Sequence, residues 1–152
     1  MKRENRNGWQ AAFLLYGIVM LWLLFGQRWG QRVVTWNLKP LDTVQRYLWV
    51  LRYSHDPNQL RHAVVNLVGN VAMFVPLGFL TPILWRRLRR FGWHALAMVL
   101  SVVAIELLQR VTRLGSCDVD DLLLNLIGTA MGYLCFRLLF RPARNTQCER
   151  KN

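Results

Sequence analysis

The chain has 152 residues, 53% of them hydrophobic, and a formal net charge of +12. Its length predicts a single domain. The charge would suit a nucleic-acid-binding protein if the basic residues gathered on one soluble surface. They flank long apolar runs instead, which excludes a nucleic-acid partner and predicts an integral membrane protein.

Four apolar runs are long enough to cross a bilayer, which takes about 20 residues. They cover residues 9–26, 63–85, 91–111 and 121–140. The expected fold class is all-α, an integral membrane four-helix bundle over 9–140 with polar tails at 1–8 and 141–152. No small-x-small cleavage site follows the first run, so we expect a retained anchor.

Basic residues are densest in the two tails and in the 86–93 loop, which holds four arginines. Such a bias marks the cytoplasmic side of a membrane protein, so we expect a multi-pass protein with both termini in the cytoplasm. The three cysteines form no CxxC pair, and the sequence therefore indicates neither a disulfide framework nor a zinc site.

Residues 27–62 form the only long loop between the predicted spans. Apolar residues recur at helical spacing within it: Leu41, Val44, Leu48 and Leu51. This spacing predicts a short amphipathic helix in the first extracytoplasmic loop, lying in the outer interface. Asp56 and Pro57 then have the form of an N-cap and a first helical position, which would start the second long helix.

The second and fourth runs contain residues that affect helix shape and packing. Pro76 and Pro82 interrupt the second run, but a membrane helix tolerates proline where neighbouring helices satisfy the freed carbonyl groups. Gly128 and Gly132 form a small-xxx-small pattern in the fourth run. This pattern serves either homodimerisation or close packing within the bundle, and we favour packing within the bundle.

Polar side chains lie inside three of the runs: Asn66 and Asn70, then Glu106 and Gln109, then Asn125. A rise of about 1.5 Å per residue places Asn70, Glu106 and Asn125 roughly 6–10 Å below the outer ends of their runs. Asp118, Asp121 and Asn125 share a face if the fourth helix starts early. Polar groups at one depth in three helices predict a buried site near one membrane face.

Structural explanations of these residues stay open. Glu106 can pair with Arg110 one helical turn along the chain, or reach the interface. Asn66 and Asn70 can hydrogen-bond between helices without any ligand.

Three aspartates lie at the start of the fourth run, and they can form a solvated loop and a helix N-cap: Asp118, Asp120 and Asp121. The histidines lack the spacing of metal ligands, and we expect no metal site at His55, His62 or His94.

Four segments resemble motifs of the VanZ-like membrane proteins. They are residues 37–43 (NLKPLDT), 66–80 (NLVGNVAMFVPLGFL), 105–109 (IELLQ) and 117–133 (CDVDDLLLNLIGTAMGY). Leu41 stands where the family usually has Phe, and Cys117 where it usually has Phe or a similar residue. The resemblance implies a four-helix protein of the bacterial cytoplasmic (inner) membrane, and it links the chain to low-level teicoplanin resistance through the family's namesake.

Our leading hypothesis is that the chain acts on, or binds, an envelope lipid headgroup or a lipid-linked wall precursor at the outer face. We expect Glu106, Asp121 and Asp118 to act as acids or bases, or to hold a cation. We expect the headgroup to be bound by the following residues: Asn66, Asn70, Gln109, Asp120, Asn125, Asn37 and Thr43. Residues 37–52 would form a lid.

No metal or cofactor is assigned, and the oligomeric state stays open. The expected partners are membrane lipids, with a lipid-linked cell-wall precursor or a lipoglycopeptide as the specific ligand. Two alternatives stay open. One is a non-catalytic binder that changes antibiotic access, and the other is a scaffold whose polar residues only hold the helices together.

Overall fold

The computed structural model describes residues 3–26, 36–37, 39–112 and 117–140, and these are almost entirely helical. The elements are α1 (Arg3–Leu21), the π-helix η1 (Trp22–Gly26), β1 (Trp36–Asn37), α2 (Asp42–Tyr53), α3 (Pro57–Leu84), the 3₁₀-helix η2 (Arg86–Arg89), α4 (Phe91–Val111), β2 (Cys117–Asp118) and α5 (Val119–Leu139). Within the described ranges, four helices are long and apolar enough to cross a membrane. The predicted all-α membrane bundle is confirmed.

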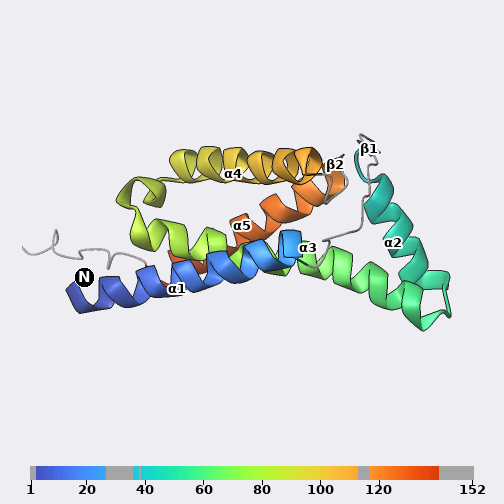
Figure 1. Cartoon of the computed structure of the whole chain (residues 1–152), viewed down its shortest axis with the longest axis horizontal. Helices are drawn as coiled ribbons and strands as arrows, with labels where there is room; N and C mark the ends of the chain where they lie inside the picture. Colours follow the sequence, from blue (N-terminus) through green and yellow to red (C-terminus); the bar gives the residue numbers. More distant parts are fainter. Residues whose placement is uncertain (1–2, 27–35, 38, 113–116, 141–152) are drawn as a thin grey trace, which may run out of the picture.

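The four long helices run along the longest axis of the molecule (Figure 1). One end of the bundle contains the C-terminal ends of α1 and α4 and the N-terminal ends of α3 and α5. The shorter helix α2 runs steeply across this end, as expected for the amphipathic helix predicted from Leu41 and Val44. All predicted polar site residues therefore belong to the end of the bundle that α2 crosses.

The start of α3 is fixed by its N-cap. Asp56 accepts a hydrogen bond from the backbone N–H of Asn58 at 2.9 Å, and Pro57 occupies the first helical position. Proline at this position costs no intrahelical hydrogen bond, because the first N–H groups of a helix have no intrahelical partner. The helix therefore begins before the apolar run at 63–85, and it continues through Pro76 and Pro82 as predicted.

Glycines allow α3 and α5 to approach closely. A Cβ atom added to Gly128 would lie 2.2 Å from the carbonyl oxygen of Val71, and one added to Gly132 would lie 2.0 Å from that of Val75. These separations are far below van der Waals contact, so only glycine fits at these two positions. The expectation that this pattern packs within the bundle is confirmed.

Two apolar clusters complete the interior. Met20 and Leu24, near the end of α1, pack with Phe74 and Val102 at mid-bundle. At the other end Ile83 packs with Tyr133 and Phe136. Large apolar side chains stay exposed along the outer faces of α1, α4 and α5, where a bilayer would cover them with hydrocarbon.

The glycine contacts predict a stability difference between matched alanine variants. Gly128→Ala and Gly132→Ala should each lower the free energy of unfolding by about 1–3 kcal/mol, because the added methyl group forces α5 away from α3. Gly69→Ala is the control, since an added Cβ there meets nothing within 4 Å. Thermal unfolding in detergent measures the difference, and equal melting temperatures for all three variants would contradict the prediction.

Candidate functional site

The first layer of polar contacts joins the turn before α2 to the start of α5. The two-residue strands β1 and β2 pair in parallel, with Asn37 opposite Asp118. Thr43 donates from Oγ1 to Oδ2 of Asp118 at 2.6 Å. The Asn37 amide donates to Thr43 Oγ1 at 2.7 Å and lies 3.4 Å from both Asp118 oxygens. Three predicted site residues thus form one hydrogen-bonded group, although Asn37 and Asp118 are 81 positions apart in the sequence.

Asp120 caps α2 from another part of the chain. Its fully buried carboxylate accepts from the backbone N–H of Leu41 at 2.5 Å and from that of Val44 at 3.0 Å. Leu41 is the N-cap residue, has a positive φ of 66° and offers no side-chain cap of its own. A carboxylate at a helix N-terminus satisfies unpaired N–H groups and interacts favourably with the helix dipole. Asp120 therefore supplies the cap that the local sequence lacks.

The second layer lies deeper in the bundle and joins α5 to α3 and α4. The Asn70 amide donates to Oδ1 of Asp121 at 2.6 Å. One turn further along α5, the Asn125 amide donates to Oε1 of Glu106 at 3.3 Å. The helix α5 begins at Val119, so Asp121 and Asn125 share a helical face, whereas Asp118 precedes the helix as its N-cap residue.

Asn125 has an acceptor oxygen that the described part of the chain does not use. Both side chains are buried, with 5% and 3% of their surface exposed. Within the part of the chain that the structure describes, no donor reaches Oδ1 of Asn125. A buried acceptor without a donor costs about 1–3 kcal/mol, and more when water cannot reach it. A donor group from a ligand would remove this cost.

Two predicted residues lie apart from these pairs. The Gln109 amide is buried and donates to the carbonyl oxygen of Leu24 at 3.3 Å, in the π-helical segment η1. Asn66 donates to the carbonyl oxygen of His62 in its own helix at 2.8 Å. Among the described residues, Asn66 makes no hydrogen bond to the other candidates, although it lies one turn from Asn70.

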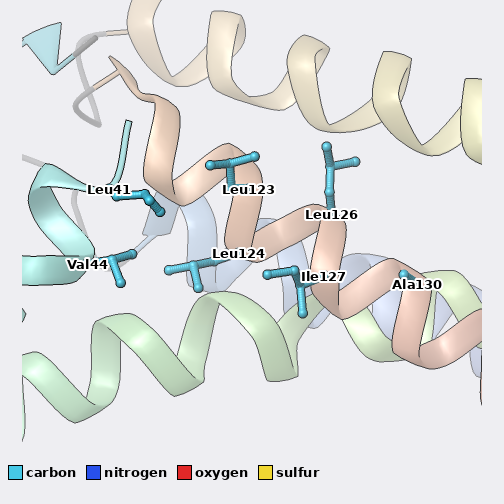
Figure 2. A pocket seen from close by; sticks show the side chains of 7 residues that line it. All are labelled: Leu41, Val44, Leu123, Leu124, Leu126, Ile127 and Ala130. Carbon is cyan, nitrogen blue, oxygen red and sulfur yellow. The ribbon is translucent and has the colours of Figure 1, made fainter. Parts of the chain in front are cut away.

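A groove of about 420 Å³ runs along a different face of α5 (Figure 2). It is lined only by apolar side chains: Leu41, Val44, Leu123, Leu124, Leu126, Ile127 and Ala130. Asp120 shares a helical face with Leu123 and Ile127, so the groove begins beside the α2 cap. This groove could not be predicted from the sequence, because its two walls come from segments about 80 residues apart.

The described residues contain no group of three His, Cys, Asp or Glu side chains that could hold a metal ion. His94 is buried, with its ring stacked on that of Tyr133 at a centroid distance of 4.3 Å. The acid/base roles of Glu106, Asp121 and Asp118 and the headgroup roles of the amide residues stay predictions, since their contacts fit both a ligand site and a structural network.

The α2 cap predicts a local change in amide exchange. Asp120→Ala leaves the N–H groups of Leu41 and Val44 without acceptors, so their hydrogen–deuterium exchange should accelerate at least tenfold. Asp42→Asn is the control, because it removes only the exposed ion pair with Arg46, a kind of contact that contributes little stability. Unchanged exchange at positions 41–44 in Asp120→Ala would show that the cap does not hold α2.

Comparison with known proteins agrees with the resemblance noted in the sequence. A family model described as VanZ/LLP1 matches residues 13–141, from within α1 to just beyond the end of α5. Comparisons with curated proteins and with solved structures found no match. The matched segment includes every candidate site residue and most of the chain. The chain therefore belongs to the VanZ/LLP1 family.

Proposed function

We propose that this protein binds the headgroup of an envelope lipid or a lipid-linked precursor at the end of the bundle that α2 crosses. The observation that carries the proposal is the buried Glu106–Asn125 pair, whose Asn125 carbonyl accepts no hydrogen bond within the described ranges. Polar groups at membrane depth are costly, and they typically mark function.

The chemistry of the pair favours a donor-rich headgroup. The Asn125 carbonyl oxygen is an acceptor that no donor reaches within the described ranges, and it lies beside the carboxylate of Glu106. Sugar hydroxyls, amide N–H groups and ammonium groups donate hydrogen bonds, whereas an ionised phosphodiester only accepts them. We therefore expect a glycosylated or amino-bearing headgroup to bind better than a simple phosphate.

The surroundings support an amphipathic ligand. The Asn70–Asp121 pair is only partly buried and lies one turn above Asn125, so it is the natural first contact for an entering headgroup. The apolar groove on the neighbouring face of α5 offers hydrocarbon contact at similar depth. The predicted lid at residues 37–52 would control entry, with Asp118 and Asp120 as its attachment to α5.

The proposed orientation places this end at the outer face of the cytoplasmic membrane. Six of the eight acidic residues belong to the segments at this end: Asp42, Asp56, Glu106, Asp118, Asp120 and Asp121. The four arginines of the segment between α3 and α4 lie at the opposite end, where positively charged loops indicate the cytoplasm. Both termini would then be cytoplasmic.

Binding of a glycolipid tests the proposal. Purified protein in detergent would be mixed with diglucosyldiacylglycerol, and the bound lipid measured by native mass spectrometry. Glu106→Gln keeps the shape of the side chain but loses its charge, so the affinity should fall at least tenfold, the usual size for a charged hydrogen bond. Ser101→Ala is the control on the same helix, since that hydroxyl only bonds Ala97 within α4.

The scaffold alternative makes the opposite prediction. If the polar residues only hold the helices together, Glu106→Gln should leave lipid binding unchanged while Asn125→Leu and Asn70→Leu lower the melting temperature. Such a result would overturn the proposal.

The VanZ-like resemblance also supports a link to glycopeptide susceptibility. Expression in a teicoplanin-sensitive Gram-positive host should raise the inhibitory concentration of teicoplanin more than that of vancomycin, and Glu106→Gln should abolish the rise at equal membrane levels. Absence of any rise with the wild-type chain would remove the antibiotic link and leave the lipid role to be tested alone.

A further inference from the structure

The end of the bundle opposite the polar site carries a dense cluster of positive charge. Arg86, Arg87, Arg89 and Arg90 lie in η2 and at its junction with α4. The sequence has no acidic residue between Asp56 and Glu106, so no carboxylate of α3 or of the first half of α4 can neutralise them.

Two of these arginines lie close to one tryptophan. The Arg87 guanidinium lies over the Trp93 ring, 5.8 Å from its centroid. Arg90 lines a cavity of about 450 Å³ together with Gly92, Trp93 and Leu96. Arg89 is engaged differently, because its Nε donates to the carbonyl oxygen of Pro82 at 3.1 Å. Arg90 therefore lines the cavity itself, and Arg87 adjoins it through Trp93.

An apolar stripe continues from the cavity along α4. Trp93, Leu96 and Leu100 are all at least half exposed and follow the spacing i, i+3, i+7 on one helix face. Gly92 contributes no side chain, and an added Cβ there would meet nothing within 4 Å. The cavity is open and mostly apolar, with Arg90 in its lining and Arg87 close by. Together with the exposed apolar stripe it complements a molecule with an anionic head and an acyl chain.

We propose that this surface is a binding site for an anionic phospholipid, separate from the headgroup site near Glu106. The phosphate would lie between Arg87 and Arg90, where guanidinium groups can form charge-assisted hydrogen bonds with its oxygens. One acyl chain would lie along Trp93, Leu96 and Leu100. Basic residues next to a membrane helix attract anionic lipids electrostatically, and the cavity adds a place for one specific lipid molecule.

Competition between lipids of equal chain length tests the site. Full-length protein in detergent would be offered phosphatidylglycerol and phosphatidylcholine, and bound lipid would be measured by native mass spectrometry. We expect wild-type protein to prefer phosphatidylglycerol, and the double variant Arg87→Gln/Arg90→Gln to lose about tenfold or more of that preference.

The matched control removes the same charge from the other end. Arg52→Gln/Arg61→Gln also lowers the net charge by two, and Arg52 likewise lies over a ring, that of Tyr53 at 5.6 Å. The control should keep the wild-type preference. An equal loss in both double variants would overturn the site, because it would reveal only a general effect of net charge.

A third variant separates the cavity from the charge. Gly92→Leu keeps every arginine and fills the cavity, so it should reduce bound phosphatidylglycerol while circular dichroism stays unchanged. Binding equal to wild type in this variant would overturn the proposal. Displacement of the lipid by millimolar glycerol phosphate would also overturn it, because a soluble anion would then suffice.

Discussion

The close contact between α3 and α5 is the constraint on which the polar site depends. Gly128 and Gly132 bring the two backbones together, since a methyl group at either position would overlap a carbonyl oxygen of α3. This approach sets the level at which Asp121 meets Asn70, and it turns Asn125 towards Glu106 on α4. Small residues hold membrane helices together by packing, because lipid provides no hydrophobic driving force between helices.

Asp118 and Asp120 then connect the membrane helices to the segment that crosses their end. Each carboxylate accepts hydrogen bonds from the turn before α2 or from its first turn. Both groups are buried, where a hydrogen bond is electrostatically stronger than in water. The position of α2 thus depends on Asp118, just before α5, and on Asp120, in the first turn of α5. One wall of the apolar groove depends on the same two side chains, because Leu41 and Val44 form it.

Acidic residues are distributed unevenly between the two ends of the molecule. The carboxylates gather at the end crossed by α2, next to amide groups and an apolar groove, while the arginines of the segment between α3 and α4 adjoin Trp93 at the other end. Under the two proposals above, each end selects a different lipid. A donor-rich headgroup suits the acceptors near Glu106, and an anionic headgroup suits the guanidinium groups near Arg90.

The sequence by itself determined the four long helices, because apolar length is the physical requirement for crossing a bilayer. It also determined the α3 start at Asp56–Pro57 and the common depth of Glu106 and Asn125, since both follow from local chemistry and helix rise. Only the tertiary structure decided which amide meets which carboxylate and that Asn66 bonds within its own helix. It also decided that Asp120 caps α2. Those pairings depend on contacts between residues far apart in the chain, which spacing along one helix cannot specify.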